Sequence, residues 1–295
     1  MLACPNCGSE LPTGASDCTK CAWRFETIDG IPSFLSDEDR RNPLWAEYTK
    51  NYQRISEIDL NQSIQHPTFL RAQTRKAIRY LGSVTGLSIC EVGVGQGLML
   101  AGLAEQAPQE LVGVDISPAY LDVLRRRGFA VIAANAENLP YRRHFDLLVA
   151  TDVIEHVINV ADFLVSANQA LKPAGKLFLR APLEENLMPY ARRLGSQYPF
   201  VHLRSFTDRS MRLLLKDAGF RIQSIWKDGF QPYFRRPFTK KNDRLSEYVD
   251  KYLSRRFAND FDIANISNFV GRILMKPTEI SVLAVRESDP RQPQF

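Results

Sequence analysis

Residues 90–100 read CEVGVGQGLML, and this stretch decides the fold of the chain. An apolar run precedes it and a helical pattern follows it, so Gly93, Gly95 and Gly97 stand in the turn between a strand and a helix. Glycine lets the backbone turn sharply there and lets a ligand approach closely. The N–H groups at the start of the next helix favour an anionic group such as a carboxylate. The stretch therefore predicts a ligand site at the first strand-to-helix turn of an α/β domain.

Short apolar runs alternate with helical segments after this turn. In order they read LSICEVG, LMLAGLAEQA, ELVGVD, PAYLDVLRRRG, AVIAA, FDLLVAT, VADFLVSANQALK and GKLFLRAP. A helix (DRSMRLLLKDAGF), a sixth strand (RIQSIWKDG) and a seventh (EISVLAVRE) follow. Such alternation is typical of a parallel sheet covered by helices on both faces. We therefore expect an α/β, Rossmann-like catalytic domain over residues 86–290, with a seven-stranded, mostly parallel sheet flanked by helices.

Polar residues after the next strands indicate the kind of ligand. Asp115 ends the second predicted strand, where a carboxylate can accept hydrogen bonds from both ribose hydroxyls. Asn135 follows the third strand and offers a side-chain oxygen to an adenine amino group. A dinucleotide fingerprint counted from Gly93 needs glycine at 98, and Leu98 stands there instead, which argues against a nicotinamide dehydrogenase.

These motifs, with LVGVDIS, NAENLP, FDLLVATDVIEHV, ALKPAGKLFLRAP and LLKDAGF, follow one another in a familiar order and spacing. Over roughly residues 86–228 and the last strand, the sequence resembles class I S-adenosylmethionine-dependent methyltransferases, in particular the small-molecule branch of ubiquinone-biosynthesis O-methyltransferases. The resemblance implies methyl transfer from S-adenosylmethionine. The cofactor-binding residues that it implies are Glu91, Gly93, Gly95, Gly97, Asp115, Ile116, Asn135, Ala136, Glu137 and Thr151. The family often has Asp where Asn135 stands.

The segment TDVIEHV follows the fourth strand, at the sheet edge where such folds bind ligands. If it is helical, Asp152, Glu155 and His156 share one face. His156 is then a candidate general base for an acceptor hydroxyl, or the three side chains bind a divalent cation, as matching positions are thought to do in some ubiquinone-type enzymes. The alternative, which we favour, is that Glu155 and His156 only orient the loop beneath the methionine. His202, after the fifth strand, is the other candidate base.

Four of the five cysteines form two CxxC knuckles separated by ten residues: Cys4, Cys7, Cys18 and Cys21. This spacing suits one tetrahedral zinc ion, whereas a pair of disulfides is the alternative. Residues 1–30 contain no secretory pattern, which favours the metal and a cytoplasmic location. Residues 1–35 cannot bury enough apolar surface to fold alone, so metal binding should supply their folding free energy.

This N-terminal stretch resembles the zinc ribbons that precede the catalytic domain in some bacterial methyltransferases, including a ribosomal RNA guanine methyltransferase family. Four thiolates leave no open coordination position, so we expect a structural zinc ion. The ribbon then either braces the catalytic domain or recognises the acceptor. We favour the brace because the ribbon has few basic residues.

Two further regions are a segment between these units and an insertion within the catalytic domain. Residues 36–85 are expected to hold a polar linker (SDEDRRN) and two amphipathic helices, the first with an aromatic stripe at Trp45, Tyr48 and Tyr52 that is more typical of a core than of a ligand site. Residues 229–278 hold ten Lys or Arg against five Asp or Glu, and many aromatics. We interpret them as a helical insertion before the last strand, either an extra subdomain or a cap over the acceptor.

The expected function is methyl transfer, by in-line displacement, to an oxygen of a small or a lipid- or nucleotide-linked metabolite. An rRNA or tRNA methyltransferase that uses the ribbon for RNA recognition is the alternative, and a non-catalytic partner subunit is a further one. The net charge of +5 is too small to indicate nucleic acid by itself. The basic stretch FRRPFTKKNDR is compatible with peripheral contact to anionic lipid. The sequence indicates no oligomeric state.

Overall fold

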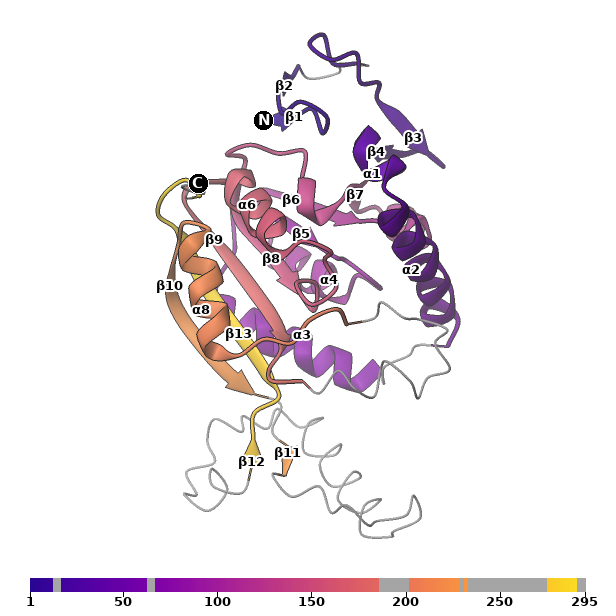
Figure 1. Ribbon diagram of the computed structural model, residues 1–295. Coiled ribbons are helices and arrows are strands. Elements are labelled where there is room, and N and C mark those ends of the chain that lie inside the picture. Colours follow the sequence, from indigo (N-terminus) through magenta and orange to yellow (C-terminus); the bar gives the residue numbers. More distant parts are fainter. Residues whose placement is uncertain (13–16, 63–66, 186–201, 229–230, 233–274, 291–295) are drawn as a thin grey trace.

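A computed structural model describes residues 1–12, 17–62, 67–185, 202–228, 231–232 and 275–290 (Figure 1). The insertion expected at 229–278 lies almost entirely outside these described residues. Within the described part of the chain, no helix combines the length and the hydropathy that a membrane-spanning segment needs.

Within the described ranges, one nine-stranded sheet forms the centre of the fold (Figure 1). Its strands lie in the order β10 (Phe220–Asp228), β13 (Glu279–Arg286), β9 (Leu171–Pro182), β8 (Phe145–Thr151), β5 (Ser88–Val92), β6 (Glu110–Asp115), β7 (Ala130–Ala133), β4 (Ile31–Ser33) and β3 (Glu26–Ile28). Neighbours from β9 to β4 are parallel, whereas β13 is antiparallel to both of its neighbours and β3 is antiparallel to β4. The predicted seven-stranded, mostly parallel sheet is confirmed, and two N-terminal strands widen it.

Helices cover both faces of this sheet. They are α3 (Pro67–Leu81), α4 (Leu98–Ala104), α5 (Pro118–Arg126), α6 (Val160–Ala170) and α8 (Asp208–Asp217). Ile89 of β5 packs with Ala77 of α3 on one side, and its neighbour Cys90 packs in the cluster that contains Phe163 of α6 on the other. Both faces of β5 are therefore buried, which explains why this strand reads as a continuous apolar run.

The N-terminal ribbon is joined to the sheet and does not stand apart from it. Ser33 of β4 pairs with Ala133 of β7, and the N–H of Phe34 donates to the Ala133 carbonyl over 2.8 Å. A small hairpin of β1 (Leu2–Ala3) and β2 (Glu10–Leu11) completes the ribbon. The side chains of Cys4, Cys18, Trp23 and Phe34 belong to the same buried cluster as α6.

The stretch expected as a linker forms a short helix, α1 (Asp37–Arg41). The Ser36 hydroxyl accepts from the Asp39 N–H, and the Asp39 carboxylate accepts from the Ser36 N–H, so the two residues form a reciprocal cap. The polar composition that indicated a linker is the composition of this cap. Helix α2 (Pro43–Gln62) follows.

Candidate cofactor site and active site

A pocket opens where the parallel strands end, with an empty volume of about 630 Å³ that includes solvent at its mouth. The sequence-predicted residues that line it are Gly93, Asp115, Ile116, Asn135, Ala136, Glu137, Asp152 and His156. They come from the ends of four strands, β5, β6, β7 and β8, and from the loops that follow them. The fold therefore brings most of the predicted cofactor residues to one cavity, at the edge where α/β sheets bind ligands.

Asp115 is fixed at the end of β6. It is 3% exposed, and it accepts hydrogen bonds from the N–H of Ser117 over 2.9 Å and from that of Gly95 over 3.2 Å. Burial raises the pKa of Asp115 to about 6, although these N–H groups act in the opposite direction. Each carboxylate oxygen keeps a lone pair, so hydroxyl groups in the pocket have an acceptor.

Close packing requires glycine at two positions of the glycine turn. Gly93 has a φ of +72°, and a Cβ there would lie 2.4 Å from a methyl of Val153. Gly97 has a φ of +74°, and its Cβ would lie 2.2 Å from a methyl of Leu124. A side chain at either position would be strained and would clash with a neighbouring element. Of the three predicted glycines, only Gly93 lines the pocket.

Glu91 and Thr151 lie at the ends of the central strands, beside the pocket and not on its wall. Glu91 is 2% exposed, and its Oε2 atom has no hydrogen-bond partner among the described residues. Burial first, and the charge of Asp115 second, raise the pKa of Glu91 well above its usual value. An unsatisfied buried carboxyl oxygen costs free energy, so this atom suits a ligand that brings a donor, such as an amino group.

The Asn135 side chain is engaged at both ends. Its Oδ1 accepts from the N–H of Glu137 over 3.0 Å, and its Nδ2 donates to Oδ1 of Asp39 over 2.7 Å. One lone pair of the amide oxygen remains for an adenine amino group. Glu137 in turn accepts from the N–H groups of Ile158 and Asn159 over 2.8 and 2.9 Å, so its carboxylate holds the neighbouring loop.

Helix α2 supplies a wall that the sequence did not reveal. Trp45, Tyr48 and Tyr52 all line the pocket. The Tyr48 and Tyr52 rings are stacked with centroids 6.0 Å apart, and Tyr52 meets Tyr120 edge to face. The helical spacing of the three aromatics did predict a shared face. Spacing alone could not show that this face borders a cavity and not a core.

The TDVIEHV segment forms a turn and not a helix, so its three polar residues do not share a helix face. Asp152 has a φ of +58° and its carboxylate pairs with the Arg180 guanidinium of β9, with one hydrogen bond of 3.0 Å and a second, shorter one. His202 joins Glu155 and His156 instead: one ligand atom of each lies within 4.8 Å of the others. Asp152 thus belongs to a separate ion pair.

The His202 segment is bound firmly to this turn. The His202 Nδ1 lies 2.5 Å from a Glu185 carboxylate oxygen, and its ring centroid lies 4.8 Å from that of His156 at 82°. The N–H of Leu203 donates to the Glu155 carbonyl over 2.9 Å. Glu155 itself is fully buried, and neither carboxyl oxygen has a hydrogen-bond partner among the described residues. Burial first, and the Asp152 charge second, raise its pKa well above the usual value.

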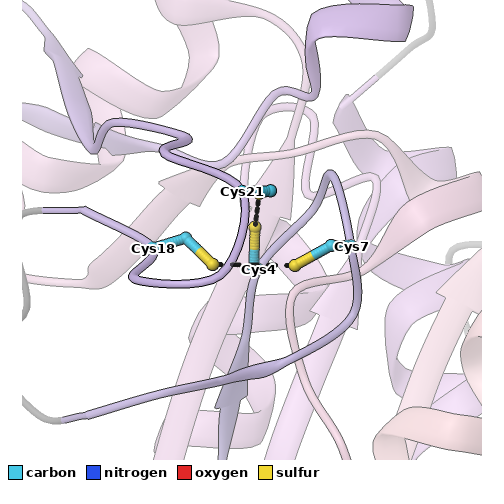
Figure 2. A group of neighbouring side chains, drawn as sticks. All are labelled: Cys4, Cys7, Cys18 and Cys21. Carbon is cyan, nitrogen blue, oxygen red and sulfur yellow. Dashed lines mark hydrogen bonds between the residues drawn. The ribbon is translucent and has the colours of Figure 1, made fainter.

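The four N-terminal cysteines converge, as Figure 2 shows. The Sγ atoms of Cys4 and Cys21 lie 3.6 Å apart, and so do those of Cys7 and Cys18. A disulfide needs about 2.05 Å. A tetrahedral site with Zn–S distances of about 2.3 Å separates its sulfurs by about 3.8 Å. The arrangement therefore fits one metal ion, and none of the four cysteines lies on the pocket wall.

Comparison with known proteins agrees with this geometry. A family model described as "Methyltransferase domain" matches residues 36–225. The demethylmenaquinone methyltransferase of Tropheryma whipplei (strain Twist) is 28% identical over 180 residues, which cover 59% of this chain and 72% of that protein. The ubiquinone biosynthesis O-methyltransferase of Bradyrhizobium diazoefficiens is 29% identical over 128 residues, which cover 41% of this chain and 50% of the relative, so that match spans half of its length.

Among solved structures, the chain is similar to a chain of the complex between the Haloferax volcanii Trm112 methyltransferase activator and a methyltransferase. The TM-score is 0.54 with 14% identity, over 84% of this chain and 99% of that chain. This similarity concerns the fold alone. The family match, in contrast, spans most of the pocket described above. The chain belongs to the methyltransferase domain family and is an S-adenosylmethionine-dependent methyltransferase.

Proposed function

We propose that this enzyme transfers a methyl group to an oxygen atom of a small or a lipid- or nucleotide-linked metabolite, by in-line displacement. The observation that carries this proposal is the position of His156. Its imidazole lies on the pocket wall and adjoins the His202–Glu185 pair. A hydroxyl acceptor must lose its proton as it attacks, so it needs a base within reach. One of the relatives named above is an O-methyltransferase of ubiquinone biosynthesis.

S-adenosylmethionine, when bound, supplies a methyl group on a positively charged sulfur that needs no further activation. The chain then has to hold the cofactor, align the acceptor and exclude water. In this proposal Asp115 accepts from the ribose hydroxyls, and Asn135 with Ala136 borders the adenine. The Oε2 atom of Glu91 takes a hydrogen bond from the amino group of the methionine part.

The two histidines have different roles in the proton transfer. The His202 Nδ1 pairs with the Glu185 carboxyl group, and this contact holds the His202 ring against His156. His156 lies on the pocket wall and takes the acceptor proton. The Glu185 carboxyl group, paired with His202, stabilises the charge that the imidazole pair acquires. Asp152, paired with Arg180, has no part in this transfer.

We further infer that the four cysteines bind a structural zinc ion. Their sulfur distances fit, and four thiolates leave no coordination position for water or substrate. The ribbon is then a brace, in keeping with the burial of Cys4 and Cys18 in the main core cluster. A cytoplasmic location stays a prediction.

The test uses S-adenosylmethionine with an isotopically labelled methyl group. Wild-type enzyme is incubated separately with the small-molecule extract and with the RNA of the cells that produce it. We expect label in a small molecule, bound to oxygen. Label confined to RNA would contradict the proposal and support the RNA-methylating alternative.

The His156→Asn variant tests the proposed base. Its rate should fall at least roughly 100-fold, as general bases typically contribute, while calorimetry shows unchanged binding of S-adenosylhomocysteine.

A divalent cation held by Glu155, His156 and His202 is a second candidate, favoured by their mutual distances and by the unsatisfied Glu155 oxygens. The Glu155→Gln variant separates the two mechanisms. Because burial raises the pKa of Glu155, ionising this carboxyl opposes folding, and the cost grows as pH rises above about 4.3, its unfolded value. Without a cation, the variant should therefore unfold at a higher temperature than wild type at pH 8. A lower unfolding temperature, together with lost Mn²⁺ binding, would support the cation.

A further inference from the structure

The first CxxC knuckle (residues 4–7) is attached on two sides to other parts of the fold. Asn6, between its cysteines, donates from Nδ2 to the Asp37 carboxylate over 2.6 Å, and its Oδ1 accepts from the Asp37 N–H over 2.9 Å. On the other side, Nδ2 of Asn138 donates to the Pro5 carbonyl over 2.7 Å. The knuckle therefore contacts both the start of α1 and the turn that borders the pocket.

Asp39 links α1 to the residues that line the pocket. Its side chain is buried, with one oxygen accepting from Ser36 and the other accepting from Nδ2 of Asn135. Asn135 caps the short 3-10 helix Ala136–Asn138, whose last residue bonds to the knuckle. A closed ring of hydrogen bonds therefore runs from the knuckle through α1 and Asn135 to Asn138, and returns to the knuckle.

This ring explains the identity of residue 135. The residue must donate a hydrogen bond to a buried carboxylate 2.7 Å away, which an Asp at this position could not do. A second carboxylate would face Asp39 at that distance with no cation between them, and like charges this close repel strongly. Asn135, Ala136 and Glu137 all line the pocket, so the ring holds part of the pocket wall.

We propose that the N-terminal ribbon is a built-in part of the cofactor site, in which the metal-loaded knuckle and Asp39 hold the Asn135 turn in its cofactor-binding arrangement. Asp39 is a positioning residue, because it acts on the cofactor only through Asn135. Metal and cofactor then bind cooperatively, each stabilising the same ring. The inference rests on the proposed cofactor contacts and on the proposed zinc ion.

A side-chain exchange tests the Asp39–Asn135 link. Asn135→Asp alone should weaken S-adenosylhomocysteine binding by roughly 10-fold or more, since a charge-assisted hydrogen bond becomes a repulsion. Asp39→Asn alone should weaken it by a similar or smaller factor. The double variant restores one amide and one carboxylate across the contact, and its affinity should return to within about threefold of wild type. Glu38→Gln, an exposed residue of the same helix, is the control and should bind as wild type does.

Calorimetry measures these affinities, and circular dichroism confirms that each variant is folded. A double variant that binds no better than the weaker single variant would overturn the proposed link. So would single variants that bind as tightly as wild type.

The metal link is tested first on the wild-type protein. Zinc release from the wild-type protein to a chromogenic chelator is measured with and without saturating S-adenosylhomocysteine, which should slow release several-fold. Release in the Asp39→Ala variant should no longer respond to the cofactor. Equal release rates in wild type would refute cooperativity even if the cofactor binds well, leaving the proposed function intact. If wild type binds no S-adenosylhomocysteine at all, the proposed cofactor contacts fail, and this inference fails with them.

Discussion

Two walls of different origin meet at the cofactor pocket. The sheet wall comes from the ends of β5, β6, β7 and β8 and supplies carboxylate, amide, imidazole and backbone groups. The N-terminal wall comes from α2, which supplies three aromatic rings, with Asp39 of α1 behind Asn135. The sheet wall carries the motifs that identify the family, whereas the N-terminal wall carries none. The difference suggests that the sheet selects the cofactor and that the N-terminal wall adds to its affinity.

Asp115 should dominate the sheet wall. Asp115→Ala removes the acceptor that we propose for both ribose hydroxyls, and each charge-assisted hydrogen bond contributes about 1.5–3 kcal/mol. We expect S-adenosylhomocysteine affinity to fall by roughly 100-fold or more, measured by calorimetry. Asp122→Ala, at a surface carboxylate paired with Arg125 and Arg126, is the control and should bind normally. A loss below about threefold in Asp115→Ala would show that the ribose lies elsewhere.

The N-terminal wall should contribute less, but measurably. Tyr48→Ala removes a half-buried ring from the pocket, and we expect roughly a 10-fold loss of cofactor affinity, within the range for loss of an aromatic contact with a base. Leu44→Ala changes a residue of the same helix that is 56% exposed, and it should have no effect. If Tyr48→Ala also bound as wild type does, the N-terminal wall would only enclose the pocket, without adding to affinity.

The smallest effect is a pH dependence that belongs to the sheet wall. Burial raises the pKa of Asp115 to about 6. In the ionised form both carboxylate oxygens accept from ribose hydroxyls, whereas in the protonated form one oxygen carries a proton of its own. Affinity should therefore be complete above about pH 7 and fall roughly fourfold between pH 7.5 and 5.5. Calorimetry of the Asp115→Asn variant should give weaker binding with a flat profile. A wild-type profile that is equally flat would place the titrating group elsewhere.

The contrast between the walls also decides how much the sequence could predict. Local patterns in the sequence predict the apolar strands of the sheet and the two cysteine knuckles. The structure confirms the fold class. Gly93 and Asp115 were found because such residues follow strands at fixed places. The predicted residues that line the pocket are those whose position depends on one strand and the turn after it.

The rest depends on contacts between distant segments, which no local pattern contains. Asp39 lies 96 residues from Asn135 along the chain. His202 lies beside Glu155 because its two neighbours bind the turn before α6. Leu203 does so through its backbone N–H and Arg204 through its side chain. Asp152 was grouped with Glu155 and His156 on the assumption of a helix, but a turn with a left-handed residue directs it to Arg180.

The most direct test of a pocket shared by two walls is hydrogen exchange followed by mass spectrometry, with and without S-adenosylhomocysteine. We expect slower exchange on binding in two separate regions: residues 91–97 with 115–117 and 135–138 on the sheet wall, and residues 37–52 on the N-terminal wall. Slower exchange confined to the sheet wall, with residues 37–52 unchanged, would contradict this expectation.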